Sequence, residues 1–216
     1  MTSDFSEDAE KAKQALVDLP RVWEGKKSIL ELKAADYNWR QMEWWAFYFE
    51  HLCRMRLKGV FQIPGERFGT VGFDLKGSVN WDLKAKAIKS DAHTCILNDC
   101  QAIDKTIRKY GEHGVLIALC DVEYNDVNRT FQMWHSKLKG GLSAYEKARR
   151  SRTSVSRYRK TRAELVELLF LRFDQSSIGR LGRMNQGRNS NGKPRPPKYM
   201  IELEDLRGIV VDRVRF

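Results

Sequence analysis

Two carboxylates and an ammonium group lie close together in the sequence, at Asp74, Asp82 and Lys84. Asp82 and Lys84 are two residues apart, so their side chains leave the same face of an extended strand. Asp74 falls on the preceding strand of a predicted tight hairpin. Isolated charges in such apolar surroundings are costly. A hard divalent cation satisfies both carboxylates, and an adjacent lysine can orient or deprotonate a metal-bound water. These residues therefore suit phosphate chemistry, in which metal and ammonium stabilise the developing negative charge.

The alternative is a solvent-exposed salt bridge on an edge hairpin, because cross-strand pairs of opposite charge are common. The order of the surrounding elements separates the two interpretations. Hydrophobic periodicity and turn residues predict, in chain order, an aromatic helix over 38–57, hairpin strands over 70–77 and 79–88, a short strand over 94–97, a helix from Asn98 or Asp99 to Tyr110, and a buried strand over 115–120. Further on, they predict strands over 128–135 and 199–216, an apolar strand or helix over 165–173, and a loop over 179–197.

This order of helix, three strands, helix and strand, with an acid on the first hairpin strand and (D/E)-x-K on the second, resembles the PD-(D/E)XK nuclease superfamily. The matching residues are Phe73-Asp74 and Asp82-Leu83-Lys84, with Phe73 in place of the proline of the family name. The resemblance covers residues 39–121. It implies an α/β (α+β) fold with a central mixed β-sheet flanked by helices and a basic C-terminal extension. One nuclease domain would span 1–216, with its catalytic core at 38–121.

The same resemblance implies roles for individual residues. Asp74 and Asp82 would hold Mg²⁺, or Mn²⁺ as a substitute, together with the Leu83 carbonyl, and Lys84 would orient the attacking water. Many members of the superfamily add a glutamate from the preceding helix. Glu43 and Glu50 are seven residues apart and so share a helix face; we favour Glu50.

A second register of the motif is open, because Asp74-Leu75-Lys76 repeats the tripeptide and Glu66 would then be the first acid. We favour the later register, since residues 79–88 better fit an internal strand that leads into the third strand and helix. In the earlier register Lys76, and not Lys84, would be the lysine that orients water.

Positive charge is concentrated in the C-terminal part. The net charge is +11, and residues 137–198 contain 17 Lys and Arg but only four acids. Such segregation is typical of a surface that binds a polyanion. Between Ser151 and Arg162, hydroxyl side chains alternate with cations, a composition suited to contacts with phosphate oxygens. The candidate phosphate-binding cations are Arg149, Arg150, Arg152, Arg157, Arg159, Lys160 and Arg162. The 179–197 loop carries residue types that read base edges, namely Arg180, Arg183, Arg188, Arg195, Asn185, Gln186, Asn189 and Asn191.

Other features exclude several classes of protein. No apolar run approaches the ~20 residues that a membrane span requires. Residues 1–10 are acidic and unlike a signal peptide, so we expect a cytoplasmic protein. The four cysteines form no C-x-x-C pair and the histidines are scattered. We therefore expect buried free thiols and oxygen ligands for the metal, and no zinc site.

Small size and a basic C-terminal part look like a type II restriction endonuclease. We expect a site-specific, Mg²⁺-dependent endonuclease that acts on double-stranded DNA as a homodimer, so that both strands are cut. One alternative is a structure-specific or repair nuclease on the same core. Another is a non-catalytic nucleic-acid-binding module in which the hairpin charges are salt bridges.

Overall fold

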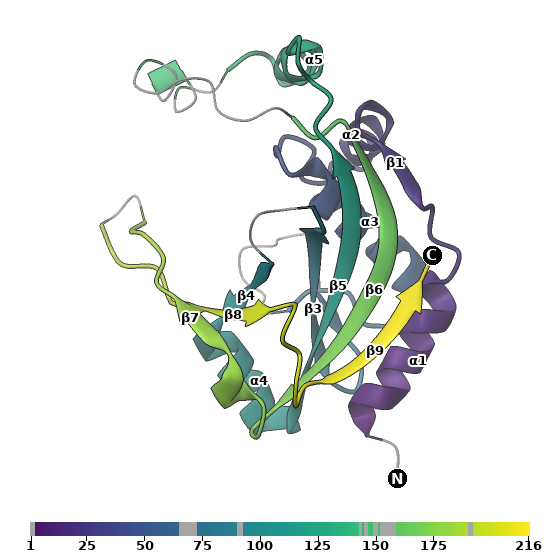
Figure 1. The fold of residues 1–216 in the computed structure, drawn as a ribbon, viewed down its shortest axis with the longest axis vertical. Helices are drawn as coiled ribbons and strands as arrows, with labels where there is room; N and C mark the ends of the chain where they lie inside the picture. The colour runs from purple at the N-terminus through teal and green to yellow at the C-terminus, as the bar shows by residue number, and fades with distance from the viewer. Residues whose placement is uncertain are drawn as a thin grey trace.

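The computed structural model describes residues 3–64, 73–89, 93–142, 144, 147–148, 151, 159–189 and 192–216. Within these ranges the chain forms a mixed α+β fold around a curled sheet (Figure 1). The helices are α1 (Asp4–Leu16), α2 (Gly25–Ala34), α3 (Trp44–Leu57), α4 (Cys100–Tyr110), α5 (Thr130–Leu138) and the 3₁₀ turn η1 (Ile178–Arg180). The strands are β1 (Val22–Glu24), β2 (Leu75–Lys76), β3 (Asn80–Ala87), β4 (Thr94–Asp99), β5 (Glu112–Glu123), β6 (Arg162–Asp174), β7 (Gly182–Met184), β8 (Lys198–Glu202) and β9 (Val210–Arg215).

The larger sheet has the order β1-β6-β5-β3-β2, with β9 also pairing with β6. β3 and β5 are parallel, and the other pairs are antiparallel. The predicted hairpin is present as β2 and β3, but β2 covers only Leu75–Lys76, and residues 70–72 of the predicted first strand lie outside the described residues. The predicted short strand at 94–97 is also present, as β4, but it does not join this sheet. It pairs with β8, which in turn pairs with β7, in a second sheet of three strands.

Two hydrophobic layers cover the faces of the large sheet. Trp81 and Leu83 of β3 pack in the cluster that includes α1, α2 and α3. The other cluster joins α4 and the small sheet to residues of β5 and β6 such as Ile117 and Leu169. Because strand residues alternate between faces, Asp82 and Lys84 point away from Trp81 and Leu83, toward the side of the small sheet.

Helix α1 fixes the turn of the β2–β3 hairpin. The buried Asp8 carboxylate accepts hydrogen bonds from the backbone N–H groups of Ser78 and Val79 and from the Trp81 indole N–H, each at 3.1 Å. Gly77 lies against this carboxylate, and a Cβ at that position would overlap it. A buried, fully bonded carboxylate in α1 therefore sets the position of the hairpin that carries Asp74, Asp82 and Lys84.

Several predicted elements differ from the observed ones. The strand predicted over 199–216 is divided into β8 and β9. The long helix begins at Trp44 and not at residue 38, because Asp36 and Asn38 adopt positive φ angles of 49° and 39°, which break a right-handed helix. The predicted strand at 128–135 is helix α5. None of the described helices is both long enough and apolar enough to cross a membrane.

Candidate functional site

The β2–β3 hairpin brings Asp74 and Lys84 together. The Asp74 N–H donates to the carbonyl of Trp81 (2.9 Å), which extends the strand pairing by one residue. Asp74 Oδ2 accepts the Leu83 N–H at 2.7 Å and lies 3.9 Å from Lys84 Nζ. Lys84 Nζ also donates to the Leu83 carbonyl at 3.0 Å. The Lys84 side chain is only 24% exposed, so this ion pair lies at a partly buried sheet edge and not on an open surface.

Asp82 is deeper, with 1% of its surface exposed. Its Oδ1 accepts a hydrogen bond from Asn98 Nδ2 at 3.1 Å, and its Oδ2 lies 3.2 Å from His113 Nε2. Asn98 belongs to β4 and His113 to β5, so residues from two other strands hold this carboxylate. Sequence reasoning missed both partners. Their signal would have been a polar side chain at the end of β4 and a histidine at the start of an otherwise apolar strand.

Glu50 reaches the same area from α3. The Tyr37 hydroxyl donates to Glu50 Oε2 at 3.1 Å. Burial raises the pKa of Glu50 to about 7, and the negative charge of Asp74 contributes to the increase. Glu43 lies elsewhere. It is the N-cap residue that precedes α3, and its carboxylate pairs with Lys160 and accepts the Trp45 indole N–H.

The expectation that Glu43 and Glu50 share a helix face is therefore wrong, because Glu43 precedes the helix. Burial would raise the pKa of Glu43, but the hydrogen bond and charge of Lys160 outweigh it and hold that pKa below its usual value. Of these two glutamates, Glu50 is the one that interacts electrostatically with Asp74 and Lys84.

The two aspartates have opposite protonation tendencies. Burial raises the pKa of Asp74, and nearby Asp82 raises it further, although Lys84 opposes both. Burial acts in the same direction on Asp82, but Lys84 and the hydrogen bonds from His113 and Asn98 outweigh it and lower the pKa of Asp82. Burial would lower the pKa of Lys84, yet Asp82, Asp74 and Glu50 together raise it. Lys84 therefore stays an ammonium ion between negative groups.

The donor set fits one kind of metal ion. In the described part of the chain, no group of three His, Cys, Asp or Glu side chains converges in a way that could hold an ion. Mg²⁺ does not need such a group, because it is commonly bound through one or two carboxylates and completed by water and substrate phosphate. Asp74 and Asp82 are near enough to affect each other's pKa, as carboxylates that can share a cation are. Asp74, Asp82 and the Leu83 carbonyl offer oxygen donors of the kind that Mg²⁺ takes.

The alternative register places its lysine elsewhere. Lys76 Nζ lies 5.9 Å from the centre of the Tyr110 ring, at the C-terminal end of α4. Glu66 lies outside the described residues. Between the two lysines of the repeated tripeptide, Lys84 is the one that forms an ion pair with Asp74.

The cations proposed to bind phosphate are described only in part. Arg149, Arg150, Arg152 and Arg157 lie outside the described residues, and Arg159 is half-buried. Lys160 pairs with Glu43 and lies 5.4 Å from the centre of the Trp45 ring. Arg162 pairs with Glu24, Glu123 and Glu164, at distances from 2.7 to 3.4 Å. Ion pairs of this kind reduce what Lys160 and Arg162 can offer to a phosphate.

The predicted loop at 179–197 contains η1 and β7 and continues as an extension that projects from the body (Figure 1). Arg188 bridges to Pro194, and its guanidinium donates to the Gly192 carbonyl at 2.8 Å. Arg195 Nε donates to Asn189 Oδ1 at 3.1 Å. These contacts join residues 187–189 to residues 192–195, and the side chains of Arg188, Asn189 and Arg195 are exposed.

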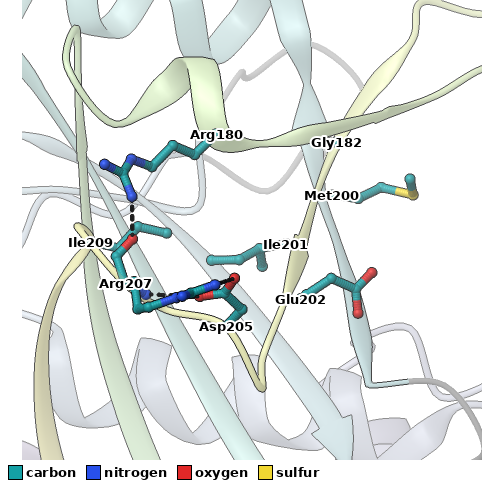
Figure 2. Close-up of a pocket in the computed structure, with 8 residues that line it drawn as sticks. All are labelled: Arg180, Gly182, Met200, Ile201, Glu202, Asp205, Arg207 and Ile209. Atoms are coloured by element: carbon teal, nitrogen blue, oxygen red, sulfur yellow. Dashed lines mark hydrogen bonds and ion pairs between the residues drawn. The ribbon is translucent and has the colours of Figure 1, made fainter.

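Arg180 and Arg183 lie at the base of this extension. Arg183 packs on the Tyr199 ring, with its guanidinium 5.4 Å from the ring centre. Arg180 borders a cavity of about 380 Å³ on the small sheet, where it donates to the Arg207 carbonyl at 3.0 Å (Figure 2). In the same cavity Asp205 pairs with Arg207 at 2.7 Å. The cavity shares no residue with the site around Asp82, and its charged groups largely satisfy one another.

Comparison of the chain with protein-family models, with curated proteins and with solved structures finds no match. The chemistry of the site must therefore be judged from its own residues. These are Asp74 and Asp82 on the two arms of the β2–β3 hairpin, Lys84 beside them, and the half-buried Glu50 on α3.

Proposed function

We propose that this chain is a Mg²⁺-dependent endonuclease of the PD-(D/E)XK type that hydrolyses DNA phosphodiester bonds. The observation that carries the proposal is the ion pair of Lys84 and Asp74 beside the buried Asp82. Solvent-exposed salt bridges contribute little and need no such enclosure. Asp82 is 1% exposed, and burial of a charged group is costly unless it is paired and hydrogen-bonded. Acids with perturbed pKa values beside a lysine are candidates for a functional site.

Each residue has a distinct task in this proposal. Asp74 and Asp82 hold the metal ion with the Leu83 carbonyl. Mg²⁺, when bound, acts as a Lewis acid on the phosphate and makes water a better nucleophile. Lys84, as an ammonium ion, orients the attacking water and stabilises negative charge on the phosphate. Glu50 ionises near neutral pH, which suits a group that accepts a proton from water during the reaction.

The substrate follows from the charge of the chain. The excess of Lys and Arg between residues 137 and 198 suits a nucleic-acid backbone. The exposed side chains of Arg188 and Arg195 are of a type that favours guanine edges, and that of Asn189 is of a type that favours adenine. We propose site-specific cleavage of double-stranded DNA, as in a type II restriction endonuclease, with a homodimer cutting both strands.

The test is digestion of a plasmid of known sequence by the purified protein, with Mg²⁺ and with EDTA. Discrete fragments that need Mg²⁺ support a site-specific endonuclease. Non-discrete cleavage that needs Mg²⁺ indicates a structure-specific or repair nuclease on the same core. Full cleavage in EDTA contradicts the metal mechanism.

One observation favours a second candidate, a non-catalytic nucleic-acid-binding module. The Lys84 ammonium donates to the Leu83 carbonyl, which is the backbone group proposed to bind the metal. In a binding module this contact would simply neutralise the charges of the hairpin. DNA binding without cleavage under any divalent cation would select this candidate.

A further inference from the structure

Asp82 is held by two side chains from other strands, in addition to the charge of Lys84. Such a carboxylate is buried and yet ionised, so each of its oxygens needs a hydrogen bond. Asn98 Nδ2 donates to Oδ1, and His113 Nε2 is hydrogen-bonded to Oδ2. Both oxygens of the carboxylate are therefore held in fixed directions by residues of β4 and β5.

The orientation of the Asn98 side chain follows from its second contact. Asn98 Oδ1 accepts the N–H of Asp99 at 2.8 Å, where α4 begins. The amide nitrogen must therefore be the atom that points at Asp82, where it donates. This contact ties the acid to the junction between β4 and α4.

His113 is more constrained. It is fully buried, and in the β3–β5 register it is opposite Asn80, on the same face as Asp82. An ionised carboxylate oxygen can only accept, so Nε2 must carry the hydrogen in their contact. Nδ1 is buried and has no hydrogen-bond partner in the part of the chain that the structure describes. The hydrogen bond to Asp82 is thus the one that the ring forms within the described part of the chain.

We infer that His113 is a positioning residue for Asp82, which it holds in the orientation required to bind the divalent cation. This inference rests on the proposed function, since it needs Asp82 to be a metal ligand. Partners that orient a ligand in this way typically contribute 10- to 100-fold to metal affinity. Loss of the His113 donor should therefore weaken cation binding without removal of any ligand.

The test measures Mn²⁺ binding by electron paramagnetic resonance, apart from any activity. His113→Leu should bind Mn²⁺ about 10- to 100-fold more weakly than the wild-type protein. His113→Gln should recover most of this affinity, because a glutamine amide can donate to Asp82 from nearly the same place. Thr106→Val is the matched control. It removes another buried polar group, which bonds to Asn80 and not to Asp82, and should leave Mn²⁺ affinity unchanged.

A second measurement observes the His113 ring directly, first in the wild-type protein. In ¹⁵N spectra of the wild-type imidazoles, His113 should be protonated at Nε2, and Asp82→Ala should shift that signal. A His113 ring protonated only at Nδ1 would overturn the inference. So would equal Mn²⁺ affinity in His113→Leu and wild type. If the wild-type protein bound no Mn²⁺ at all, the proposed metal site itself would fail, which is a different result.

Discussion

Glu50 provides a prediction that does not depend on catalysis. Replacement by glutamine removes the titratable group but keeps an oxygen that can accept the Tyr37 hydroxyl. The pKa of Glu50 is raised from 4.5 to about 7, first by burial and then by Asp74. An acid with a raised pKa binds its proton more tightly in the folded state. Its contribution to stability is therefore greatest at low pH and is lost as the pH rises toward 7.

The size of the effect follows from the two pKa values. Each tenfold difference in proton affinity corresponds to about 1.4 kcal/mol. The difference between 4.5 and about 7 therefore makes ionised Glu50 cost the folded state roughly 3 kcal/mol. The side chain is partly exposed, and solvent screening reduces this to about 2 kcal/mol.

The assay is urea unfolding in EDTA, followed by tryptophan fluorescence between pH 5 and pH 8. Glu50→Gln should match the wild-type free energy of unfolding near pH 5 and exceed it by about 2 kcal/mol at pH 8. Glu43→Gln is the matched control. Because the pKa of Glu43 is lowered, that variant should show no gain as the pH rises. A constant difference between Glu50→Gln and wild type across this range would refute the assignment of a buried, proton-binding Glu50.

Three further outcomes are expected. Cleavage should require Mg²⁺ or Mn²⁺ and should survive a zinc-selective chelator. Ca²⁺ should support DNA binding but poor cleavage, because its looser coordination geometry positions the attacking water less well. Equal cleavage rates in Ca²⁺ and Mg²⁺ would count against this prediction. Gly77→Ala should lower the free energy of unfolding by about 1–3 kcal/mol, because the added Cβ overlaps Asp8. In the same urea titration, Gly179→Ala should have a free energy of unfolding near that of the wild-type protein, because the space at Gly179 is open. If Arg188 contacts a base, Arg188→Ala should weaken binding to cognate DNA by about 1–3 kcal/mol and binding to random DNA almost not at all. Equal losses of binding free energy on both DNAs, with the salt dependence of binding reduced by about one in slope, would make Arg188 a phosphate contact.

The sequence predicted the hairpin because its information is local. Asp82 and Lys84 alternate with apolar residues, so their shared face follows from strand geometry alone. Asp74 joins them through a short turn. The buried strands at 115–120 and 165–173 were also recognisable as apolar segments, although only the structure assigns the second one to β6 and not to a helix.

Residues 128–135 were predicted as a strand, but residues 130–135 lie in helix α5, whose first turn is capped by a side chain close by in the sequence. The buried Asp126 carboxylate accepts the N–H groups of Phe131 and Gln132, which satisfies donors of the first helical turn. Alternation of Phe131 and Met133 with polar residues fits a strand equally well, so the pattern alone could not separate the two.

The surroundings of Asp82 could not be predicted, because segments far apart in the sequence form them. β4 leaves the large sheet because its partner, β8, lies about a hundred residues farther along the chain. Asn98 and His113 meet Asp82 only after β4, α4 and β5 have packed together. Spacing in the sequence does not encode such contacts between strands.

The most direct test of the account compares two lysines of the same hairpin. DNA cleavage in Mg²⁺ should be measured for the wild-type protein, Lys84→Ala and Lys76→Ala, with the free energy of unfolding as a control. Lys84 is 3.9 Å from Asp74, so its removal should abolish cleavage while the protein stays folded. Lys76 lies beside Tyr110, and its removal should leave cleavage close to wild type. Loss of cleavage in Lys76→Ala with normal cleavage in Lys84→Ala would contradict the proposed active site.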